Sequence, residues 1–121
     1  FLTPQNISLP PDHGARLVTM GLAEEDLKSN WMAELETIRK SMLSLRTQLA
    51  NELEKLSGSN RFGFLVDHRG MFSRLGASSE QVSALREKHG IYMVGDSRLN
   101  IAGLNSSSVP ILAKAIVDCG I

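Results

Sequence analysis

Residues 90–104 read Gly90-Ile-Tyr-Met-Val-Gly-Asp-Ser-Arg-Leu-Asn-Ile-Ala-Gly-Leu104 and place a single arginine, Arg98, between two short apolar runs. The runs Ile91–Val94 and Leu99–Ala102 predict two short strands, and the polar segment between them predicts a turn. An arginine that leaves such a turn can present its guanidinium fork to a carboxylate through two parallel hydrogen bonds. Taken alone, Arg98 would more commonly form a local ion pair with Asp96.

A long amphipathic helix is predicted for residues 24–56. Its apolar side chains recur at steps of three or four residues: Leu27, Trp31, Leu35, Ile38, Met42, Leu45, Leu49, Leu53 and Leu56. Acidic residues fill the first turn, where the helix dipole favours negative charge, and Gly58 follows the last leucine as a stop signal. At 1.5 Å per residue this helix would be about 50 Å long. Because the core of a small domain needs only a shorter helix, this length predicts a helix that continues from one packing partner to another.

Two further strands are expected between this helix and the 90–104 segment. The alternation of Phe62, Phe64 and Val66 predicts the first, and the run Met71–Ser73 predicts the second. The fold is therefore predicted to be α+β, with helices packed on a small mixed sheet.

Three shorter helices complete the prediction. A mostly apolar stretch at residues 15–22 predicts one, and Ser78 with Gln81 has capping-box spacing at the start of the next. A last helix should begin within Asn105–Ser108, all acceptable caps, with Pro110 in its first turn. Its predicted buried face consists of Leu112, Ala113, Ile116 and Val117.

Composition bounds the function. The chain has 121 residues, of which 42% are apolar, and its 13 basic and 13 acidic residues cancel, so no partner nucleic acid or membrane is expected. Cys119 is the single cysteine, which excludes an intrachain disulfide and suits a cytoplasmic setting. The chain begins at Phe1 rather than methionine and is expected to be a piece of a longer protein.

Familiar catalytic motifs are absent from the sequence. It contains no Gly-x-Ser-x-Gly, no phosphate loop and no Gly-x-Gly-x-x-Gly. His13, His68 and His89 lack the spacing of metal ligands and are expected at the surface or its boundary.

Three segments together resemble the class I aminotransferases, the aspartate and aromatic amino acid group. Ser8-Leu-Pro-Pro-Asp-His-Gly-Ala15 is similar to the family's Ser-Asn-Pro-Pro-x-His-Gly-Ala turn. Arg69-Gly-Met-Phe-Ser73 and Ser97-Arg-Leu-Asn-Ile-Ala-Gly103 are similar to two of its later segments. Their order, with the long helix after the first, makes the resemblance specific. It covers nearly the whole chain and implies the small carboxyl-terminal domain of a fold-type I pyridoxal phosphate enzyme.

The resemblance implies a division of labour within a longer parent enzyme. Arg98 matches the arginine that binds the substrate α-carboxylate, and Phe72 matches an aromatic residue that lines the substrate cavity. No residue of this chain is expected to be catalytic, because the lysine that binds pyridoxal phosphate lies upstream in the family, and no covalent attachment of the cofactor is expected here. Residues 1–23 are expected to belong with a large domain outside the chain, and residues 24–121 to form the small domain.

For the parent, the resemblance implies transfer of an amino group from aspartate or an aromatic amino acid to a 2-oxo acid, by a homodimer. Pro4 stands where the family has an arginine for the distal carboxylate of aspartate, Leu9 replaces an asparagine, and Arg74 replaces an aromatic residue. The side-chain preference is therefore open. Two alternatives also stay open: a non-catalytic helical dimerisation or binding module, and another fold-type I pyridoxal phosphate enzyme, a lyase or decarboxylase.

Overall fold

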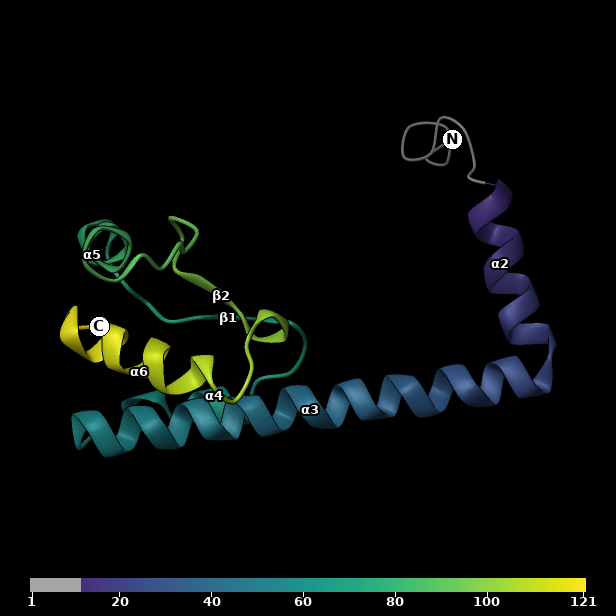
Figure 1. The fold of residues 1–121 in the computed structure, drawn as a ribbon, viewed down its shortest axis with the longest axis horizontal. Coiled ribbons are helices and arrows are strands. Elements are labelled where there is room, and N and C mark those ends of the chain that lie inside the picture. The colour runs from purple at the N-terminus through teal and green to yellow at the C-terminus, as the bar shows by residue number, and fades with distance from the viewer. Residues whose placement is uncertain (1–11) are drawn as a thin grey trace. The chain divides into compact units, whose positions relative to one another are not determined.

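The computed structural model describes residues 12–121, and Figure 1 shows its elements in order. Pro4, Leu9 and the first half of the Ser8–Ala15 motif lie outside the described residues. The elements are α2 (Asp12–Ala23), α3 (Glu25–Ser57), α4 (Phe64–Asp67), β1 (Phe72–Arg74), α5 (Ser79–His89), β2 (Arg98–Asn100) and α6 (Ser108–Asp118). Two 3₁₀ turns, Asn60–Phe62 and Ile101–Gly103, precede α4 and follow β2.

The chain divides into two compact units, one ending at Ile38 and the other running from Arg39 to Ile121. The division falls inside α3. The bounds of α3, Glu25–Ser57, confirm the long helix predicted for residues 24–56. The apolar side chains of α3 differ in solvent exposure between the two units. Those of the first unit are exposed at the surface of α3, whereas Leu45, Leu49 and Leu53 are buried.

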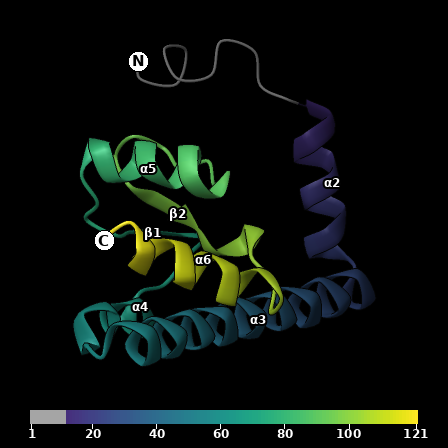
Figure 2. The same cartoon turned by 60° about the vertical axis from the view of Figure 1, so that its left-hand side comes forward.

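The second unit has an α+β core, as predicted. In both views α6 runs beside the carboxyl-terminal half of α3, and the two strands lie between α6 and α5 (Figures 1 and 2). The side chains at its centre are almost wholly inaccessible to solvent: Leu49, Leu53, Phe62, Leu65, Leu85, Ile101 and Ile116. Burial of this apolar surface is the main force that holds the unit together.

The strand predicted at residues 62–66 is wrong. The side chain of Ser59 accepts a hydrogen bond from the backbone N–H of Arg61 and starts a 3₁₀ turn, which α4 follows. Phe62 and Leu65 are both buried, and a spacing of three residues puts two side chains on one face of a helix rather than of a strand. The alternation that suggested a strand was too short to distinguish the two periods.

The strand predicted at Ile91–Val94 is also wrong, and the one at Leu99–Ala102 is displaced. Residues 91–94 pair with no strand among residues 12–121. β2 occupies Arg98–Asn100, because the Asn100 side chain accepts from the backbone N–H of Ala102 and turns the chain into a 3₁₀ conformation. The sheet in the described chain is accordingly a two-stranded antiparallel ribbon rather than a mixed sheet.

The predicted helix signals are confirmed. Ser78 and Gln81 form the reciprocal capping box at the start of α5. Gly90 ends that helix in the left-handed conformation, with a φ of 65°, and its N–H reaches the carbonyls of Arg86 and Leu85. The side chain of Asn105 accepts from the backbone N–H groups of Ser107 and Ser108 where α6 begins.

Candidate site on the two-stranded ribbon

The ribbon brings the two predicted site residues to one exposed face. Phe72 lies opposite Asn100, and Arg74 lies opposite Arg98, in an antiparallel register. Because side chains alternate along a strand, these four share a face, while the middle residue of each strand, Ser73 or Leu99, is buried. Phe72 and Arg98 are diagonal neighbours, a relation that spaces Cα atoms by about 7–8 Å.

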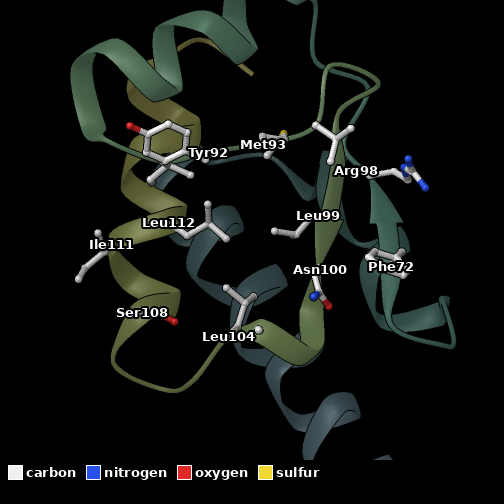
Figure 3. A pocket seen from close by; sticks show the side chains of 13 residues that line it. Phe72, Tyr92, Met93, Arg98, Leu99, Asn100, Leu104, Ser108, Ile111 and Leu112 are labelled. Carbon is white, nitrogen blue, oxygen red and sulfur yellow. The ribbon is translucent and has the colours of Figure 1, made fainter.

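Figure 3 shows Phe72, Arg98 and Asn100 among the residues that line an apolar cavity of about 570 Å³. Leu99, Leu104 and Leu112 lie on the α6 side of β2, and Arg98 and Phe72 lie on its other side. Phe72 is 51% exposed although its side chain is large and apolar. The face therefore combines a guanidinium with an uncovered aromatic ring, a pairing suited to a carboxylate that carries an apolar group.

Arg98 is held by the turn before it, as the sequence alone suggested. Its Nε lies 2.8 Å from Oδ2 of Asp96 in an ion pair whose side chains are 49% and 40% exposed. Partial desolvation raises the pKa of Asp96, but the hydrogen bonds and charge of Arg98, with the charge of Arg74, outweigh it and leave that pKa below its usual range. The guanidinium of Arg98 thus already pairs with one carboxylate, that of Asp96.

The site rests on a buried arginine that the sequence analysis did not single out. Arg46, on α3, is 1% exposed and donates to the Oγ of Ser73 at 2.6 Å and to the carbonyl of Gly70 at 2.7 Å. Longer hydrogen bonds reach the carbonyls of Phe72, at 3.2 Å, and Leu65, at 3.4 Å. Burial lowers the pKa of Arg46, and the charge of Arg69 lowers it further. The guanidinium thus fixes the backbone on both sides of Met71.

The position of Arg46 in the sequence indicates that it is buried. It follows Met42 by four residues and precedes Leu49 by three, so it occupies the apolar face of the long helix. A charged residue on such a face must find hydrogen-bond acceptors. Which acceptors it finds could not be deduced, since they lie 19 to 27 residues further along the chain.

His68 joins the same network from the surface. Its Nδ1 lies 3.0 Å from the Ser73 Oγ, which already accepts from Arg46 and can therefore donate its own hydrogen to the imidazole. His13 and His68 are exposed and His89 is half-buried, in agreement with the prediction for the three histidines. Residues 12–121 contain no cluster of three potential metal ligands and no helix with the length and hydropathy needed to cross a bilayer.

The positions of the lysines bear on pyridoxal phosphate, the cofactor that the resemblance implies for the parent enzyme. Proteins attach this cofactor through a lysine, and no lysine lines the cavity beside the ribbon. The lysines of the sequence lie on α3, α5 and α6: Lys28, Lys40, Lys55, Lys88 and Lys114. None of these lysines lies on the ribbon, which is formed by β1 and β2.

Comparison with known proteins identifies the family. The sequence model of the family described as aminotransferase class I and II matches residues 2–116. The aromatic-amino-acid aminotransferase of Paracoccus denitrificans is 60% identical over 121 residues, which are 100% of this chain and 31% of that protein.

Two solved structures are similar over almost the whole chain. An aromatic amino acid aminotransferase with 3-indolebutyric acid has a TM-score of 0.92 at 60% identity, over 100% of this chain and 31% of its own. The aromatic-amino-acid aminotransferase of Burkholderia pseudomallei covalently bound to pyridoxal phosphate has a TM-score of 0.87 at 36% identity, over 96% of this chain and 29% of its own. The chain spans about a third of the length of these relatives. With a family match across nearly all its residues, it belongs to the class I and II aminotransferases.

Proposed function

We propose that this chain is the carboxyl-terminal domain of a pyridoxal-phosphate-dependent aminotransferase in which Arg98 binds the α-carboxylate of the substrate. The observation that carries the proposal is the exposed guanidinium of Arg98, which lies on the ribbon face beside Phe72 and already attracts a carboxylate, that of Asp96. The family membership and the lengths of the relatives support the placement within a longer enzyme.

The bound cofactor would supply the electron sink for transamination, and this chain would supply orientation. A guanidinium that holds the substrate by two parallel hydrogen bonds restricts its rotation and fixes the Cα–H bond relative to the cofactor. Fixing that geometry makes the proton transfer effectively unimolecular. Arg98 is thus a substrate-binding residue rather than an acid or a base.

Phe72 is proposed to cover the substrate when the small domain approaches the large domain. Once the site closes, the exposed ring of Phe72 would exclude water from Arg98. The ion pair between Arg98 and the substrate carboxylate is stronger in a site with less water.

Residues 1–23 are proposed to belong with a large domain outside the chain, and the exposed apolar side chains of the first unit, which continue to Ile38, are proposed to contact that domain. Residues 12–38 expose a run of large apolar side chains: Leu17, Val18, Met20, Leu22, Leu27, Trp31, Met32, Leu35 and Ile38. Within this unit an apolar groove of about 410 Å³ is lined by both helices, α2 and α3. Contiguous apolar surface of this kind marks an interface. The resemblance further supports a cytoplasmic homodimer.

The proposed amino donor is an aromatic amino acid, because the relative at 60% identity carries that name, and aspartate is the alternative. The partner is a 2-oxo acid. Steady-state rates of the full-length enzyme with L-phenylalanine and with L-aspartate would distinguish the two donors.

The same assay tests Arg98. Losing two charge-assisted hydrogen bonds of about 1.5–3 kcal/mol each should lower kcat/KM of Arg98→Ala at least about a hundredfold. The loss should be equal for both donors, because both carry the same α-carboxylate. Arg86→Ala, at an exposed position of α5, is the matched control and should behave as wild type. An Arg98→Ala enzyme with unchanged kcat/KM would contradict the proposal.

A further inference from the structure

The carboxylate of Asp96 contacts Arg98 at two points. Its Oδ1 accepts from the backbone N–H of Arg98 at 3.2 Å, and its Oδ2 lies 2.8 Å from the Nε of the same residue. One side chain therefore ties the main chain of Arg98 to its guanidinium. An arginine side chain has many rotamers in solution, and such a clamp restricts them.

The turn that carries Asp96 is itself fixed to β1 and its continuation. Ser97 has a φ of 62°, unusual for a residue with a side chain, and it is buried. Its carbonyl accepts from the N–H of Leu75 at 3.1 Å, and its Oγ accepts from the N–H of Gly76 at 3.1 Å. The carbonyl of Asp96 accepts from the Nε of Arg74 at 3.1 Å. A backbone conformation that is held against its own preference commonly marks a functional constraint.

The pairing of Asp96 with Nε determines which N–H donors of the Arg98 guanidinium remain for a ligand. A guanidinium has five N–H donors, and a carboxylate can approach it along the edge that contains Nε or along the end formed by Nη1 and Nη2. Asp96 approaches from the Nε edge. The two parallel donors at the end of the side chain then remain for a second carboxylate, which they could bind in the bidentate geometry that gives the strongest pairing.

We propose that Asp96 is a positioning residue, which holds the Nε edge of Arg98 so that its Nη1–Nη2 end faces the carboxylate of the substrate. This inference rests on the proposed function of Arg98. Asp96 could also have the opposite effect on binding, because its negative charge repels the carboxylate of a ligand. Both side chains are partly exposed, at 49% and 40%, so solvent screens that repulsion. We therefore expect that removal of Asp96 costs more in lost orientation of Arg98 than it gains in relieved repulsion.

The experiment measures the affinity of the full-length enzyme for 3-indolebutyric acid, a carboxylate found with a relative. Its dissociation constant is obtained by competitive inhibition for wild type, Asp96→Ala, Arg98→Ala and the double variant. Asp96→Ala should weaken binding about three- to tenfold, the range associated with immobilising one long side chain. Asp96→Asn keeps one acceptor oxygen and should lie between. Asp118→Ala, at the exposed end of α6, is the matched control.

The double variant separates positioning from a general structural effect. If Asp96 acts through Arg98, Asp96→Ala should have no further effect once Arg98 is alanine. Equal losses in both backgrounds, or tighter binding by Asp96→Ala, would overturn the inference. Unchanged binding by Arg98→Ala would instead refute the proposed function, so the two failures are distinguishable.

Discussion

Replacement of Arg46 by methionine should destabilise the second unit strongly. Its two short hydrogen bonds, at 2.6 and 2.7 Å, come from a charged donor and contribute about 1.5–3 kcal/mol each, or about 3–6 kcal/mol together. Relief of the cost of burying a charge offsets part of this loss. We therefore expect Arg46→Met to lower the free energy of unfolding by about 2–4 kcal/mol, and Arg46→Lys to lose less, because an ammonium can still reach one acceptor.

Urea denaturation of the 121-residue chain, followed by circular dichroism at 222 nm, measures this effect. With a slope of about 2 kcal/mol per M, the midpoint should fall by about 1–2 M. Arg86→Met removes an arginine from an exposed helix position and should leave the midpoint unchanged. If Arg46→Met unfolded at the same urea concentration as that control, the reasoning from buried hydrogen bonds would be refuted.

Three further predictions follow from the turn and the helix ends. Gly90→Ala should cost about 1 kcal/mol of unfolding free energy, because the φ of 65° disfavours a side chain, whereas Gly95→Ala, with no positive φ, should cost less. Ser78→Ala should cost about 1 kcal/mol by removing the capping box of α5, and Ser83→Ala, in the exposed middle of that helix, should not destabilise; midpoints of thermal unfolding compare each pair. The lowered pKa of Asp96 means that its pairing with Arg98 stabilises the fold above the usual aspartate pKa, and that this contribution is lost as the pH falls through the lowered value. The difference in stability between wild type and Asp96→Asn should therefore be greatest near neutral pH and vanish in acid; a constant difference would contradict the pairing.

The helices could be predicted from the sequence because their signals are local. The capping box at Ser78, the left-handed Gly90 and the polar cap at Asn105 each lie within a few residues of the element they begin or end. Propensity and capping act at that range. The position of Arg98 after its turn, and its ion pair with Asp96, were local in the same sense.

The strands were less predictable because pairing is not local. Residues 91–94 have the composition of a strand, yet within residues 12–121 they pair with no strand. Residues 62–66 instead follow a polar cap, Ser59, and lie in helical turns. Composition shows that a segment can form a strand, whereas a partner decides whether it does.

The buried arginine connects these observations to the ribbon site. Arg46 holds the carbonyls of Gly70 and Phe72 and the hydroxyl of Ser73, so it fixes β1. The ladder between the strands then fixes β2, in which Arg98 lies opposite Arg74. A position that presents an exposed guanidinium accurately must be rigid beneath it. The chain achieves this with an arginine in the core below β1 and an aspartate at the surface beside Arg98, and the two act from opposite sides of the same ribbon.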